Sequence, residues 1–451
     1  MKSAEYEARI ARRDQLSAVD VLGSFDFSTT LIHLKSLVTA DIERARAVYM
    51  EYKPNWNAGN PDLLTGDQYS ALTKVNPLIV HEYTHFIDAT STLWGLRHLK
   101  LMGQAYTARF LGENEYYKSK IFFDHVRSIR LPDYYTVKNG SADEDMPWRY
   151  NITIGRLFGS RGEITNRPVL FSRFRNSGGD VIVRSPISTV SILEASAMAQ
   201  EIISRSHLLK LTNQEYRLIE DREVQRKTLK FLYSRDLTEY SVCVHVLANK
   251  LGCKDVLVAF GICARLTRLV LNFPEVIFDK LVETCPIEQV LDIPEGHAFG
   301  LAVRDGLRGR DLGTLYYLLC NALPGNVIQS EQNLEAGISF ALNALGVQDE
   351  VLYGAAEAEA NDLAALLNPS SIASIKTLAA AGYDNFKTIG LQCRELRLDK
   401  LNLPPAILGD DTALNPFASD GNSLTDFDIE SCFSELDDGS SWVARFSEGC
   451  V

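Results

Sequence analysis

The stretch that decides the fold runs from Asn76 to Asp88 and reads Asn-Pro-Leu-Ile-Val-His-Glu-Tyr-Thr-His-Phe-Ile-Asp. Asn is a favoured N-cap, and Pro is tolerated at the first helical position because its missing N–H would be unpaired there in any case. Asn76-Pro77 therefore predicts the start of a helix. The following residues are apolar on nearly all sides apart from a short polar motif, so we expect this helix to be buried.

The polar residues of this helix have the spacing of metal ligands. His81 and His85 are four residues apart, which places two imidazoles on one helix face, one turn from each other. Two such imidazoles can bind one tetrahedral metal ion. Glu82 lies about 100° further round the helix axis, from where its carboxylate can reach a water on the metal without being a ligand. The metal would lower the pKa of that water toward about 7, and Glu82 would take the proton as general base.

His81-Glu82-Tyr83-Thr84-His85 is an HExxH motif, and it resembles that of the zincin metallopeptidases. The longer metzincin pattern needs Gly at position 88 and His at position 91, where this chain has Asp88 and Ser91. The helix is similar to those of bacterial proteins in the gluzincin branch, which take a third ligand from a Glu on a later helix. The resemblance covers residues 76–90 and one later segment. It implies a zincin-like core, a zinc ion and a protein or peptide substrate.

The later segment runs from Leu193 to Glu201 and resembles the second helix of gluzincins, where the ligand Glu has a small residue three positions on. The resemblance implies that Glu194 is the third zinc ligand, with Ala197 as the small residue. Two alternatives stay open. Ser191 and Glu194 also fit a capping box, in which Glu194 would only bind a backbone N–H. Glu201 lies two turns further along the same face and competes for the ligand position.

Further residues have weaker signals for a role at this site. Asp88 is on the metal-facing side and could hold a ligand imidazole through its second nitrogen, or it could face solvent near the helix end. His98 follows a break at Trp94-Gly95 and is a minor candidate ligand. The remaining histidines have no motif context, and one of them, or a tyrosine, could stabilise an oxyanion: they are His33, His125, His207, His245 and His297.

Composition narrows the class of protein. The 451 residues suffice for two or three domains, and 46% hydrophobic with 23% charged residues is typical of globular chains. A net charge of -12 disfavours nucleic-acid binding. No signal peptide and no run of about 18 apolar residues is visible, so we expect a soluble, cytoplasmic protein without a membrane span. The eight cysteines lack CxxC spacing, which indicates reduced core thiols; Cys243 and His245 as half of a second metal site is a minor alternative.

The patterns along the chain predict an α+β, predominantly helical fold. Residues 1–210 would form the zincin-like catalytic region, 211–403 a mainly helical domain and 404–451 an acidic, loosely ordered tail. The smaller predictions are a strand within 21–34, a helix over 40–52, loops at 53–57, 59–62 and 138–143, a hairpin over 168–183, and helices over 190–210, 314–323 and 355–367.

The expected function is zinc-dependent hydrolysis of a peptide bond. The same residues could hydrolyse another amide or an ester, because the motif defines the chemistry better than the substrate. A non-catalytic interaction protein with a structural metal, or with a vestigial site, is the alternative of a different class. Glu82 argues against it, because a structural zinc site needs no general base. The sequence does not define the oligomeric state.

Overall fold

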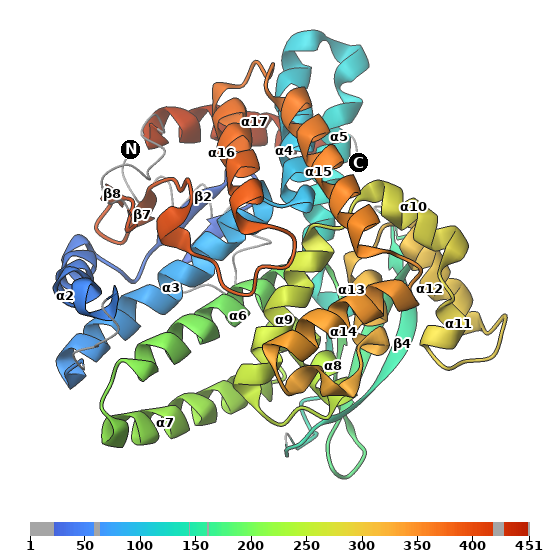
Figure 1. Cartoon of the computed structure of the whole chain (residues 1–451). Coiled ribbons are helices and arrows are strands. Elements are labelled where there is room, and N and C mark those ends of the chain that lie inside the picture. The colour runs from blue at the N-terminus through green and yellow to red at the C-terminus, as the bar shows by residue number, and fades with distance from the viewer. Residues whose placement is uncertain (1–21, 58–63, 144, 160–161, 418–427, 450–451) are drawn as a thin grey trace.

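The computed structural model describes residues 22–57, 64–143, 145–159, 162–417 and 428–449, without the side chains of 52–57. Within these ranges the chain is α+β and predominantly helical, as predicted, with two four-stranded sheets (Figure 1). The α-helices are α2 (Thr39–Asn57), α3 (Gly66–Thr90), α4 (Leu93–Leu111), α5 (Tyr117–Ile129), α6 (Thr189–Lys210), α7 (Gln214–Leu232), α8 (Thr238–Leu251), α9 (Val256–Leu271), α10 (Glu275–Thr284), α11 (Ile287–Val290), α12 (Ala298–Arg308), α13 (Leu312–Ala322), α14 (Glu331–Ala344), α15 (Asp349–Leu367), α16 (Ala373–Ile389) and α17 (Ile429–Glu448). Short 3-10 helices are η1 (Glu113–Glu115), η2 (Asp133–Tyr135), η3 (Gly325–Ile328) and η4 (Leu398–Lys400).

The first sheet joins the two ends of the described chain. Its strand order is β1-β2-β7-β8, where β1 (Ser24–Asp26) and β2 (Leu31–Leu34) form an antiparallel hairpin. The strand predicted within residues 21–34 is therefore confirmed and consists of two strands. β7 (Ala406–Leu408) pairs with β2 in parallel, and β8 (Ala413–Leu414) closes the sheet.

The second sheet is antiparallel and lies between α5 and α6 in the chain. Its strand order is β3-β6-β5-β4, with bounds Val137–Lys138, Val181–Pro186, Ile164–Arg175 and Arg149–Phe158 in that order. The predicted hairpin is confirmed, because β5 and β6 pair across the turn at residues 176–180. The helix predicted over 190–210 is confirmed as α6.

The start predicted for the HExxH helix is wrong. α3 begins at Gly66, where Thr65 and Gln68 form a capping box, and Pro77 lies in its interior. One proline removes a single backbone hydrogen bond from the helix. Burial of one face from Tyr69 onward outweighs that loss, because apolar burial contributes about 25 cal/mol per Å². The loop predicted at 53–57 is also wrong, since α2 continues to Asn57, while residues 59–62 lie outside the described ranges.

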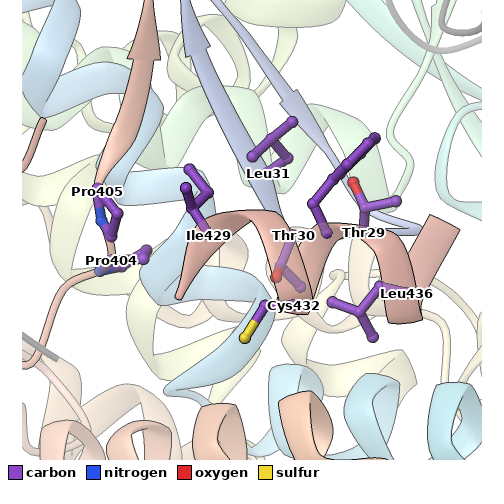
Figure 2. A pocket seen from close by; sticks show the side chains of 9 residues that line it. Thr29, Thr30, Leu31, Pro404, Pro405, Ile429, Cys432 and Leu436 are labelled. Atoms are coloured by element: carbon purple, nitrogen blue, oxygen red, sulfur yellow. The ribbon is translucent and has the colours of Figure 1, made fainter. Parts of the chain in front are cut away.

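The predicted loosely ordered tail is contradicted by the described part of residues 404–451. β7 and β8 extend the first sheet, and α17 packs on α4, α5 and α16. Between α17 and the β1–β2 turn there is a cavity of about 10 Å³, lined by apolar side chains such as Leu31, Ile429 and Leu436 (Figure 2). This volume holds no more than one water molecule. The contact between α17 and the β1–β2 turn is therefore closely packed and is not a ligand pocket.

Beside a small cluster of Tyr135, Val169 and Phe171, one large hydrophobic core runs through the described residues, from Phe25 to Val443. It includes residues on both sides of the predicted domain boundary at 210, and that division stays a prediction. No single described helix is long and apolar enough to cross a membrane, although α9 and α10 pass such a test together as a pair bent by 98°. The described cysteines are free thiols, and Cys450 lies outside the described ranges. Cys243, Cys263, Cys285 and Cys320 are buried, as predicted for core thiols, whereas Cys253, Cys393 and Cys432 are half-buried.

Candidate metal centre

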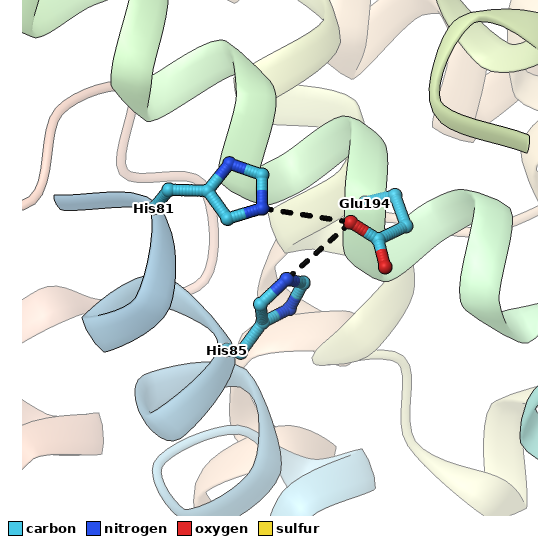
Figure 3. Close-up of side chains that lie close together, drawn as sticks. All are labelled: His81, His85 and Glu194. Atoms are coloured by element: carbon cyan, nitrogen blue, oxygen red, sulfur yellow. Dashed lines mark ion pairs between the residues drawn. The ribbon is translucent and has the colours of Figure 1, made fainter. Parts of the chain in front are cut away.

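Helices α3 and α6 lie side by side and bring the predicted ligands together (Figures 1 and 3). Oε2 of Glu194 is 3.6 Å from Nε2 of His81 and 3.4 Å from Nε2 of His85. One ligand atom from each of the three residues lies within 4.8 Å of the others. Ligands of a tetrahedral zinc, each about 2.0–2.1 Å from the ion, lie about 3.3–3.4 Å apart. The observed separations are therefore close to those that zinc requires.

The three side chains have an environment that fits a cation. Their exposed fractions are 9% for His81 and 5% for both His85 and Glu194. Oε2 of Glu194 is buried and has no hydrogen-bond partner among the described residues, although both imidazoles face it. A buried carboxylate oxygen without a donor is costly. A metal ion between the three groups would remove that cost.

The capping-box alternative for Glu194 is wrong. α6 begins at Thr189, with Ser188 as N-cap and Ser191 as the residue that completes the box. Glu194 therefore lies in the second turn, where backbone N–H groups bond within the helix. Its other oxygen, Oε1, accepts a hydrogen bond from Nη2 of Arg130 at 3.1 Å. Arg130 follows the end of α5, and no local pattern in the sequence indicates this contact.

Glu201 lies on the opposite side of the His81 ring from Glu194. Its Oε2 is 3.3 Å from Nδ1 of His81, and its Oε1 accepts from Nε of Arg205 at 3.2 Å. The carboxylate therefore faces the ring nitrogen that points away from Glu194. A carboxylate in that position orients an imidazole ligand and raises its basicity. The sequence predicted Glu201 as a competitor for the ligand position, and the geometry favours this supporting role instead.

The charges of the two imidazoles and the nearby carboxylates shift one another's pKa values. Burial alone would lower the pKa of His81, but Glu194 and Glu201 raise it well above its usual value. Burial likewise works against a charged His85, whose pKa is raised by Glu194. Burial would raise the pKa of Glu194, but the two imidazoles and Arg130 hold it below its usual range. The cluster therefore keeps its carboxylate ionised, which is the form that binds a cation, and a bound metal ion would displace the protons that the raised pKa values favour on the two imidazoles.

Replacing Glu201 with Ala is expected to weaken zinc binding by about 10- to 100-fold, because it removes the carboxylate that orients His81. Zinc affinity measured by competition with a chromophoric chelator checks this. Arg205→Ala is the matched control, since it removes the partner of Glu201 but leaves the contact with His81. Equal zinc affinities of Glu201→Ala and wild type would contradict the assigned role.

Glu82 lies beneath the N-terminal strand. Its residue is 2% exposed, and a Cβ at Gly23 would lie 2.7 Å from Oε1 of Glu82. Glycine at position 23 therefore allows the backbone before β1 to pack directly on the carboxylate. Phe25 and Phe27 continue this cover, with ring centroids 6.3 and 6.2 Å from that of His85. The N-terminal segment thus covers one side of the centre and limits the access of water there, which strengthens electrostatic interactions.

Asp88 does not support a ligand imidazole in the way the sequence predicted. Its carboxylate is completely buried and lies 2.7 Å from Nη1 of Arg268 on α9. Nδ1 of His85 has no hydrogen-bond partner among the described residues. The expectation that Asp88 faces solvent is wrong as well. Burial raises the pKa of Asp88 and the charge of Arg268 opposes that rise, so the pair ties α3 to α9 behind the centre.

Asp88→Asn is expected to lower the free energy of unfolding by about 3–5 kcal/mol, because it leaves a buried guanidinium without its counter-charge. Denaturant unfolding of Asp88→Asn, Arg268→Met and the double variant checks this. The double variant should lose less than the sum of the two single losses, since no unpaired charge remains. Losses that simply add would show that the two groups do not interact.

His98 is not a ligand. Its Nε2 donates to the carbonyl oxygen of Phe27 at 2.7 Å, so its Nδ1 accepts from Nε2 of His125 at 3.0 Å. Burial lowers the pKa values of His98 and His125 to about 3 and 4, so both are neutral at pH 7. They hold the turn after β1 over the centre.

His245 is a core residue that donates to the carbonyl oxygen of Leu232, and no described cluster pairs it with Cys243.

No protein-family model, curated protein or solved structure matches the chain. What the centre can do therefore follows from its own residues. Two imidazoles and a carboxylate could hold one divalent cation, and the carboxylate of Glu82 lies next to the first imidazole in the sequence. The local sequence contained no signal for Arg130, Gly23 or Arg268, because each reaches the centre from a separate element.

Proposed function

We propose that the chain is a zinc-dependent hydrolase that cleaves peptide bonds, with Glu82 as general base. The observation that supports this most is the convergence of His81, His85 and Glu194 within 4.8 Å of one another. This is the ligand set expected of a gluzincin-type centre. The zincin-like character of the surrounding core is part of the same proposal.

The number of protein ligands supports catalysis over a structural metal. Among the described residues the centre offers three ligands from His, Cys, Asp and Glu. Structural zinc sites have four protein ligands, whereas catalytic sites have three and leave one position for water or substrate. When bound, zinc supplies Lewis-acid chemistry, which acidifies water and polarises a carbonyl group.

The residues of the centre would have separate roles in metal binding and proton transfer. His81, His85 and Glu194 hold the ion, and Glu201 fixes the orientation of the His81 ring. Glu82 accepts a proton from the attacking water and later returns it to the leaving amine. Arg130 keeps Glu194 ionised and in place. Hydrolysis of another amide or ester would use the same groups, so the substrate class depends on direct tests.

We expect about one zinc ion per chain, lost in His81→Ala, His85→Ala and Glu194→Ala because each variant removes one ligand. Elemental analysis of the purified protein checks the stoichiometry, and digestion of a peptide library checks the activity. His207→Ala is the matched control, because this half-exposed imidazole pairs with Glu395 on the surface. A wild-type chain without metal even after zinc reconstitution would overturn the proposal. If Glu194→Ala holds zinc as tightly as wild type, the third ligand lies elsewhere.

A further inference from the structure

The outer face of the second sheet carries a group of arginines. Direct neighbours in an antiparallel pair point to the same face, and so do residues two apart in a strand. Arg173 on β5 is directly opposite Arg184 on β6, and Arg175 is opposite Arg149 on β4. Four guanidinium groups therefore share this face. The opposite face, with residues such as Phe174, packs on the core.

These arginines have no carboxylate partner among the described residues. Within the described ranges, no carboxylate lies within 4.0 Å of Arg149, Arg173 or Arg184, and the Arg173 side chain forms no hydrogen bond. Several half-buried arginines elsewhere are paired with a carboxylate, as in Arg97–Glu359, Arg130–Glu194, Arg265–Glu335 and Arg304–Glu288. Like charges directly opposite in a sheet are destabilising. The chain carries a net charge of -12, so unpaired arginines here do not follow from a general excess of basic residues.

One of the two opposed guanidinium groups is fixed in place. Cζ of Arg184 lies 3.6 Å from the ring centroid of Phe171, so its guanidinium is stacked on the ring. A Cβ at Gly155 would come within 2.7 Å of Phe171 and 2.9 Å of Arg184, so only glycine leaves room for this stack. Tyr135 covers the other part of the ring at 6.2 Å. A guanidinium held this way loses little freedom when it binds an anion.

We propose that this face binds a small phosphate-bearing molecule, with Arg173 and Arg184 holding the phosphate oxygens. Arginine forks match the geometry of phosphate and bind it through two parallel N–H···O bonds. A bound oxyanion would also neutralise the repulsion between the two opposed groups. The neighbouring Tyr134 is 61% exposed and lies beside Tyr135, so an aromatic ring on the same ligand has a surface to stack on.

Titration of the full-length protein with pyrophosphate and with ADP, followed by calorimetry and thermal shift, tests this. Both should bind and raise Tm, and ADP should bind more tightly because its base adds a stacking contact. Arg173→Gln and Arg184→Gln should each weaken binding by at least about tenfold. Arg156→Gln is the matched control, since Arg156 is exposed on β4 and bonds to Asn166 away from this group. Arg173→Gln should fold with an unchanged or higher Tm, because its side chain has no partner to lose.

Three results would overturn the proposal. The first is that neither pyrophosphate nor ADP binds. The second is that binding survives in Arg173→Gln but disappears in His81→Ala, which would place the anion at the metal centre. The third is that a single-stranded oligonucleotide binds far more tightly than ADP, which would make the face a nucleic-acid surface. The test does not depend on hydrolytic activity, so its outcome is separate from that of the proposed function.

Discussion

Replacing Glu82 with Gln is expected to lower kcat/KM for peptide hydrolysis by about 10²- to 10⁴-fold while the zinc content stays at the wild-type level. The amide preserves the shape of the side chain against Gly23, but it cannot accept a proton from water. Because Glu82 is not among the three converging ligands, its loss should leave the metal in place. Steady-state kinetics on a cleaved library peptide, together with elemental analysis, checks both parts.

The control for this experiment is Glu113→Gln, which removes one negative charge from an exposed position outside the centre. It should leave kcat/KM unchanged. Release of zinc from Glu82→Gln would make Glu82 a ligand, and unchanged kinetics would remove it from the mechanism. Either result would require a different division of roles among the residues of the centre.

Ending the chain after Leu403 is expected to abolish cooperative unfolding. The truncation removes β7 from its pairing with β2, and it removes the carbonyl of Pro404 that accepts from the Tyr83 hydroxyl at 2.8 Å. It also exposes the surfaces that α17 covers on α4, α5 and α16. Each buried Leu or Val side chain contributes about 1.5–3 kcal/mol, and several such residues are lost from a protein whose total stability is about 5–15 kcal/mol. Thermal unfolding followed by circular dichroism checks the result.

A point substitution tests the same contact without shortening the chain. Gly439 on α17 packs directly on the ring of Tyr106, so a side chain there would collide with it. Gly439→Leu should therefore lower Tm clearly, while Asp438→Leu at the exposed neighbouring position should change it little. Equal effects of the two variants, or a truncated chain with wild-type Tm, would show that residues 404–451 do not stabilise the fold.

The helix start at Asn76 and the loosely ordered C-terminal segment were both predicted from local residue types, and tertiary packing overrides both. Asn76-Pro77 has the residue types of a helix start, but Thr65 and Gln68 satisfy the free N–H groups earlier and the buried face extends α3 in front of the proline. The C-terminal segment is rich in Asp, Gly and Ser, which suggests loose order. Its Gly residue at 439 is instead a close-packing position against another helix. The composition of a segment indicates whether it is polar on average, but it does not show that a glycine packs closely against another helix.

The relative positions of some site residues follow from the sequence because these residues lie within one helix. The period of 3.6 residues places His81 and His85 on one face and Glu82 beside them, whatever the helix packs against. The segment around Glu194 resembles the second helix of gluzincins, and this resemblance predicted a third ligand on a separate helix. The structure places the Glu194 carboxylate beside the two imidazoles.

Contacts between residues of different helices and strands were decided only by the tertiary structure. The partner of Asp88 is Arg268 on α9, the support of Glu194 is Arg130 after α5, and the opposed arginines Arg173 and Arg184 meet across two strands. Helical periodicity fixes the distances between side chains within one element, but it contains no information about which element packs against it. That choice depends on burial and shape complementarity over the whole chain, so these contacts become visible only when the helices and strands are packed together.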